Sequence, residues 1–233
     1  MTLRPLAWAA LAAALLSGCA TTTGSRDDPL EPFNRAMYAI HEPIDRDVVQ
    51  PIARAWLELP AALRQPVTNF FGNIDDLFSG VNGVLQGKTE KAAHDFGRVM
   101  TNSLYGLGGL IDVASGAGIP KGEEDFGQTF GVWGIPHGPY LFVPVFGPTT
   151  VRDGTGVIIR AYTTPVGYLE DVSARNTLWG VGLLDLRAQA LETQSIVQQA
   201  ALDPYTFVRR AYLQRRAYLT YDGRPPTPKE DDE

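Results

Sequence analysis

The chain has few of the residues on which metal sites and covalent cross-links are commonly built. Its 233 residues include one cysteine and three histidines, and 20 Lys and Arg face 26 Asp and Glu, for a net charge of −6. A single cysteine excludes a disulfide framework and any site with several thiolate ligands. His41, His94 and His137 show no metal-ligand spacing. The acidic balance argues against a nucleic-acid-binding face, which requires clustered cations.

Motifs of the common enzyme classes are also missing. The chain contains no His-Glu-x-x-His helix, no Gly-x-Ser-x-Gly elbow, no Walker loop and no dinucleotide fingerprint. Asp75 and Asp76 are adjacent, and neighbouring positions on a helix point in different directions, so they form a poor acid–base pair. We therefore expect a protein that is not an enzyme, with no catalytic residue, metal or cofactor.

No apolar run is long enough to span a bilayer, which takes about 20 residues. The unbroken run from Leu6 to Leu16 follows one positive charge at Arg4, as in a secretory signal peptide. It ends in Leu-Ser-Gly-Cys, which resembles the lipobox of bacterial lipoproteins. We expect residues 1–18 to be a signal peptide and Cys19 to carry the acyl chains, such as palmitate, of a lipoprotein. Two or more chains hold a protein stably on a membrane.

The rest of the chain predicts an all-α fold in a single domain, residues 29–221, between a short polar tether (19–28) and a disordered tail (222–233). The 24 glycines and 17 prolines indicate short amphipathic helices joined by irregular Gly- and Pro-rich segments. Periodicity and breakers predict helices that start at Pro29 and stop at Pro43, run from Asp47 to Pro60, and cover residues 74–86, 89–104, 176–202 and 203–219.

Residues 126–151 are the unusual segment, because they include no charged side chain but many aromatic ones. Four prolines and five glycines exclude a continuous helix. Irregular backbone at membrane depth survives only where protein buries it or where it lines a wet cavity. We take this segment and the helix at 74–86 as sources of lipid-facing or pore-lining side chains; the alternative for the segment is a buried loop of a soluble core. The candidates are Phe78, Val81, Phe130, Trp133, Tyr140, Phe142 and Phe146.

The last predicted helix is basic and aromatic. Such a helix can lie at a membrane interface or bind phosphate headgroups or a partner, although an ordinary solvated face fits the pattern equally well. The candidate binding residues are Arg209, Arg210, Arg215 and Arg216, interleaved with tyrosines.

Four ordered blocks of the sequence resemble the MlaA (VacJ) family of outer-membrane lipoproteins. They are Asp-Pro-Leu-Glu-Pro-Phe-Asn-Arg-Ala-Met-Tyr at 28–38, Asn-Ser-Leu with Gly-Gly-Leu-Ile-Asp-Val-Ala at 102–114, Phe-Gly-Gln-Thr through Val-Arg-Asp at 126–153, and Asp-Pro-Tyr through Arg at 203–216.

The resemblance implies a ring-like helical body in the inner, periplasmic leaflet of the outer membrane. It also implies association with a porin trimer and transfer of phospholipid to a periplasmic carrier of the MlaC type. The task would be removal of mislocalised phospholipid from the outer leaflet, which preserves lipid asymmetry. A structural lipoprotein that acts only as a porin-binding scaffold, and an envelope hydrolase, are the other hypotheses.

Overall fold

The computed structural model describes residues 28–200 and 202–226, and only the backbone of 192–200. The predicted signal peptide, Cys19, the tether up to residue 27 and the end of the predicted tail lie outside these residues. The described part is built almost entirely of helices, which confirms the predicted all-α class. Its only departure is a two-stranded antiparallel hairpin, β1 (Tyr140–Val143) and β2 (Gly147–Thr150), in which Tyr140 lies opposite Thr150.

One long, bent helical segment opens the described chain. α2 (Glu31–Ile44) continues through a π-helical turn, η2 (Asp45–Val49), into α3 (Gln50–Glu58). The predicted break at Pro43 is therefore wrong. Proline removes one backbone donor and clashes with the preceding turn, and the wider π turn directly after Pro43 accommodates it without ending the helix.

A helical hairpin follows. α4 (Ala61–Leu85) begins 13 residues before the predicted 74–86 helix because Pro66 in its second turn does not interrupt it. α5 (Thr89–Tyr105) matches the predicted 89–104 helix. The two pack closely, since a Cβ added at Gly80 would lie 2.9 Å from the Phe96 ring.

The charge-free segment 126–151 is more ordered than the sequence suggests. It contains α7 (Phe126–Val132) and the β-hairpin. A short helix, α6 (Val113–Gly116), precedes the segment. The following helix, α8 (Val151–Thr163), was not predicted; the Thr150 side chain caps it by accepting a hydrogen bond from the Asp153 amide.

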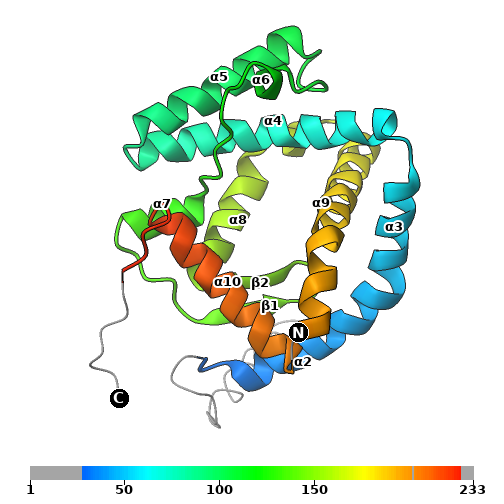
Figure 1. The fold of residues 1–233 in the computed structure, drawn as a ribbon, viewed down its shortest axis with the longest axis vertical. Helices are drawn as coiled ribbons and strands as arrows, with labels where there is room; N and C mark the ends of the chain where they lie inside the picture. The colour runs from blue at the N-terminus through cyan, green and yellow to red at the C-terminus, as the bar shows by residue number, and fades with distance from the viewer. Residues whose placement is uncertain (1–27, 201, 227–233) are drawn as a thin grey trace, which may run out of the picture.

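The last helices agree with prediction more closely. A 3₁₀ turn, η3 (Pro165–Tyr168), leads to α9 (Val172–Ala200) and then α10 (Pro204–Thr220), which Asp203 caps. In Figure 1, α4 runs across the upper part beneath α5 and α6, α3 descends on one side to α2, and α10 crosses the lower part, while α8 and α9 run between them. The helices thus follow the ring-like outline that the family resemblance implies.

Candidate functional site

Polarity in this molecule is partly reversed relative to a water-soluble domain, although many charged side chains are exposed as well. Among the described residues, 35 large apolar or aromatic side chains are exposed, whereas nine hydrophobic residues are buried and four of those are alanines. Nineteen polar or charged residues are buried. Soluble proteins rarely leave large apolar patches in contact with water. The candidate site is therefore an apolar outer surface around a polar interior.

One part of this surface is a stripe along α2, η2 and α3. Its exposed members are Phe33, Ile40, Ile44, Val48, Ile52 and Leu59. Side chains four apart drift around a regular α-helix, but the π turn at 45–49 takes up one additional residue and brings the stripe back into line. We call these six residues the apolar stripe. Its four central members are four residues apart, and Phe33 and Leu59 lie seven residues beyond either end. The spacing was visible in the sequence, but the stripe was not predicted as a surface.

A second part lies at the end of α5. Leu104, Tyr105 and Leu107 are each at least 70% exposed. The backbone turns there through three successive left-handed residues, Leu107, Gly108 and Gly109. Glycine adopts this conformation without a steric penalty, which accounts for the Gly-Gly pair in the second sequence block. The loop therefore presents its apolar residues to the surroundings rather than folding them back.

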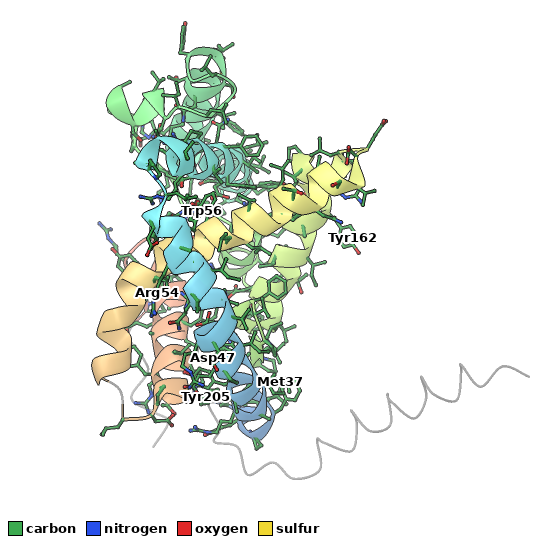
Figure 2. The ribbon with its side chains drawn as sticks, turned by 90° about the vertical axis from the view of Figure 1, so that its right-hand side faces the viewer. Met37, Asp47, Arg54, Trp56, Tyr162 and Tyr205 are labelled. Atoms are coloured by element: carbon green, nitrogen blue, oxygen red, sulfur yellow. The ribbon has the colours of Figure 1, made fainter. Side chains whose placement is uncertain are left out.

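A third part is the corner from α8 through η3 to the start of α9. Tyr162 is 79% exposed and points away from the body in Figure 2. Tyr168 is also exposed, and its hydroxyl donates to the backbone oxygen of Tyr162 at 3.0 Å. Val157 and Ile158 are also exposed, on α8, the helix that carries Tyr162. Tyrosines flanking aliphatic side chains are typical of a membrane–water interface.

The aromatic candidates of the 126–151 segment divide between surface and core. Trp133 is exposed, and its indole N–H donates to the Leu85 carbonyl at 3.0 Å; Phe146 is 70% exposed at the hairpin tip. Phe130 is half-buried and packs against Trp133. Tyr140 and Phe142, by contrast, form a core cluster with Tyr205.

The prediction that Tyr140 and Phe142 face lipid or a pore is therefore wrong. They point inward because β1 is anchored on α2: the Asn34 side chain donates to the Tyr140 carbonyl and accepts from the Phe142 amide, both at 2.9 Å. Phe78 is also buried, beneath Arg160, while Val81 remains exposed.

The interior is held together by buried ion pairs and hydrogen bonds. Arg98 is 2% exposed; it bonds Asp76 at 2.8 Å and Asp112 at 3.1 Å, and joins α4, α5 and the start of α6. Burial on its own would raise the pKa of Asp112, but hydrogen bonds from Ser115, Asn102 and Arg98 outweigh it and lower that pKa to about 2. Asp112 therefore stays ionised and fixes the arginine.

A second buried cluster joins the two ends of the described chain. Asp28, which is fully buried, forms an ion pair of 2.9 Å with Arg209 and accepts hydrogen bonds from Asn34 and the Tyr205 hydroxyl. Burial, with the hydrogen bond to Asp28, raises the pKa of Tyr205 well above its usual range. In Figure 2, Tyr205 lies between α10 and the α2 segment.

The four arginines predicted to bind headgroups or a partner are thus not equivalent. Arg209 is a core residue that Asp28 holds inside, which contradicts the prediction that it binds a headgroup or a partner. Arg216 is also mostly buried, where its guanidinium bonds Asp125 and Asp153. Arg215 is exposed and pairs with Glu123 at 3.3 Å, and Arg210 is exposed. Of the four arginines, only these last two are exposed at the surface.

A pocket of about 290 Å³ lies between the α7–β1 connection, the start of α8 and the end of α10. Arg152, Arg216 and His137 contribute its polar lining, and Ile135, Pro136 and Leu213 contribute apolar surface. None of the lining residues belongs to the apolar stripe.

The described residues contain no cluster of three or more His, Cys, Asp or Glu arranged to hold a metal ion. In the same residues, no helix has both the length and the apolar character needed to cross a bilayer.

Comparison with known proteins agrees with the sequence blocks and the fold. Residues 26–219 match the family described as MlaA lipoprotein. The "Intermembrane phospholipid transport system lipoprotein MlaA" of Escherichia coli (strain K12) is 36% identical over 92% of this chain and 88% of its own length. The protein of the same name from Haemophilus influenzae is 32% identical over 99% of this chain and 96% of its own.

A solved structure reported as "Structural basis for maintenance of bacterial outer membrane lipid asymmetry" has the same fold. It superposes with a TM-score of 0.73 at 34% identity, over 84% of this chain and all of that one. On this evidence the chain belongs to the MlaA lipoprotein family.

Proposed function

We propose that this protein is an outer-membrane lipoprotein that removes mislocalised phospholipid from the outer leaflet through an amphipathic passage and hands it to a periplasmic carrier. Its relatives from E. coli and H. influenzae bear names that assign them to intermembrane phospholipid transport, and the similar solved structure concerns outer-membrane lipid asymmetry. The proposed role is maintenance of that asymmetry.

The observation that carries the proposal is the reversed polarity of the fold. A phospholipid headgroup that crosses hydrocarbon without a polar route pays a large desolvation cost. A body that exposes many large apolar side chains can sit partly among acyl chains. In this proposal, polar groups that line the passage would replace water around the headgroup. No covalent bond changes in such a transfer, so the proposal assigns no catalytic residue.

The anchor belongs to the same proposal. With residues 1–18 removed, acylated Cys19 would hold the protein in the periplasmic leaflet. Asp28 follows Cys19 by nine positions, and an extended chain spans at most about 3.6 Å per residue, so this tether reaches roughly 30 Å. Asp28 is fixed inside the body by Arg209. The α2–α10 corner would therefore stay close to the bilayer.

The proposal also assigns a role to the rest of the chain and names the partners. Residues 29–221 would be the lipid-transfer body and 222–233 a tail. The protein would act with phospholipid, an outer-membrane porin trimer and a carrier of the MlaC type.

Outer-leaflet phospholipid in intact cells tests the proposal. Deleting the gene should increase the phospholipid that reagents or phospholipases can reach from outside, and the wild-type gene should restore the original level. No increase on deletion would contradict the transport role. Purification separates the scaffold alternative: a conduit should retain both porin and phospholipid, whereas a scaffold should retain porin alone.

A further inference from the structure

The pocket between α7, α8 and α10 has the construction of an anion site. We propose that it binds the phosphate group of a glycerophospholipid headgroup, with Arg152 as the principal contact. This inference rests on the proposed function and adds to it a defined place for the headgroup.

Arg152 is held so that part of its guanidinium remains free. Its side chain is 9% exposed, Nε lies 3.1 Å from an Asp153 oxygen, and Nη1 lies 3.4 Å from the Ile135 carbonyl. No acceptor from the described part of the chain bonds Nη2. An arginine oriented by a carboxylate and carrying free N–H groups is well suited to a phosphate oxygen.

Arg216 supplies a second incomplete donor. Its Nη1 and Nη2 bond Asp125 at 2.5 and 2.9 Å, and Nη2 also bonds Asp153 at 3.0 Å. Its Nε is buried and finds no acceptor within the described chain. A buried donor without an acceptor costs about 1–3 kcal/mol, and Arg216 Nε carries that cost. The unpaired Arg152 Nη2 is not among the buried atoms that lack a partner, so it remains accessible to a ligand.

Two glycines of α7, one turn apart, make room for these arginines. A Cβ at Gly131 would lie 2.7 Å from Arg152 Nη1, and one at Gly127 would lie 2.7 Å from Arg216 Nη2. Any larger residue would displace the guanidinium groups. The positions of both arginines are therefore part of how α7 packs on α8 and α10.

The charge of the pocket and its apolar lining together indicate which class of ligand it would bind. Arg152 and Arg216 are balanced by Asp125 and Asp153, so the pocket has no excess fixed charge and attracts anions through directed hydrogen bonds. Its apolar lining, with Ile135 at 47% exposure, suits the glycerol and first acyl carbons of a lipid better than a free, fully hydrated phosphate. A lipid phosphodiester fits both features.

Direct binding measurements on the full-length protein in maltoside detergent test the proposal. The probes are dihexanoyl phosphatidylethanolamine below its micelle concentration and inorganic phosphate, each titrated by calorimetry. The variants are Arg152→Gln, which removes the donor, and Ala217→Glu, which places a carboxylate in the pocket and keeps both arginines. The matched controls are Ala217→Gln, of similar size without charge, and Arg54→Gln, which changes an exposed arginine of α3 outside the pocket.

The wild-type protein and both controls should bind the short-chain lipid saturably. Arg152→Gln and Ala217→Glu should each raise the dissociation constant for this lipid at least tenfold. Ala217→Glu and Ala217→Gln are nearly equal in size and differ in charge. A difference in lipid binding between them therefore reflects the added charge rather than misfolding. Equal binding of inorganic phosphate, or equal lipid binding by Ala217→Glu and Ala217→Gln, would overturn the inference. If the lipid does not bind but gene deletion still raises outer-leaflet phospholipid, this inference fails and the transport role stands.

Discussion

At the scale of single residues, buried charges hold the fold together in place of a large apolar core. Arg98, Arg209 and Arg216 each pair with carboxylates from distant parts of the chain. A buried pair adds little stability relative to an apolar pair of equal shape, but removing one partner is costly because it strands the other charge. The arrangement therefore predicts large penalties for single substitutions.

Asp28→Asn keeps the shape of the side chain and removes the charge that faces Arg209. We expect a loss of about 3–5 kcal/mol in the free energy of unfolding, measured by urea titration in detergent with circular dichroism. Glu170→Gln, which removes an exposed carboxylate, is the control and should change stability by no more than about 0.5 kcal/mol. An Asp28→Asn protein as stable as the control would show that the cluster is not structural.

Asp112 predicts a specific dependence of stability on pH. Its folded pKa of about 2 lies below its ordinary value of 3.8, so the unfolded chain binds more protons between these limits and stability falls as pH drops from about 4 to 2. Asp112→Asn should be less stable than wild type at pH 7, and the difference should shrink across this interval. Urea midpoints at pH 7, 4 and 2 measure it; a constant difference would contradict the role assigned to Asp112.

At the scale of elements, the apolar stripe of α2, η2 and α3 should bind hydrocarbon. Val48→Gln with Ile52→Gln removes two of its exposed apolar side chains. Burying one such side chain contributes about 1.5–3 kcal/mol, so losing two partly exposed ones should weaken vesicle binding of the Cys19→Ala protein by about tenfold or more.

The matched control changes two exposed polar positions of the same helical segment. Asp47→Gln with Arg54→Gln introduces the same residues and leaves the net charge unchanged. Flotation of the variants with phospholipid vesicles measures the effect. Equal flotation of both double variants would show that the stripe does not meet lipid.

Sequence periodicity predicted some elements well and others not at all. α5 and α10 were found because clear breakers or caps bound them: Gly106 ends α5, and Asp203 with Pro204 starts α10. α8 and the hairpin were missed because glycines and prolines lie within and around them and obscure the periodicity. The break expected at Pro43 was wrong because a π turn, which no local pattern announces, absorbs the proline.

The sequence predicted which types of surface the candidate site would have, but not which side chains would face outward. Apolar helix faces and a basic last helix were visible in the sequence, as was the family resemblance. The inward direction of Arg209 and Arg216 was not, because their carboxylate partners, Asp28, Asp125 and Asp153, lie on other elements. Similarly, Tyr140 was taken for a lipid-facing residue because sequence cannot reveal the Asn34 contact that turns its strand.

At the scale of the whole molecule, the exposed apolar surface predicts poor solubility in water that does not depend on acylation. The Cys19→Ala protein, expressed without porin, should aggregate when detergent is removed, because the stripe, the loop after α5 and the α8–α9 corner would then face water. Size-exclusion chromatography with light scattering measures this. A monodisperse monomer in detergent-free buffer would count against immersion in a lipid monolayer.

Immersion itself is tested most directly by spin labels placed around the outline. Labels at Val48→Cys, Tyr105→Cys and Phe146→Cys, in protein reconstituted into phospholipid vesicles, report by electron paramagnetic resonance whether apolar oxygen or a water-soluble nickel chelate reaches each position. Asp47→Cys, the polar neighbour of Val48, is the control. The reversed polarity predicts that oxygen relaxes all three labels more strongly than the chelate does, and that the control shows the opposite. Stronger relaxation by the chelate at all three apolar positions would contradict a body that lies among acyl chains.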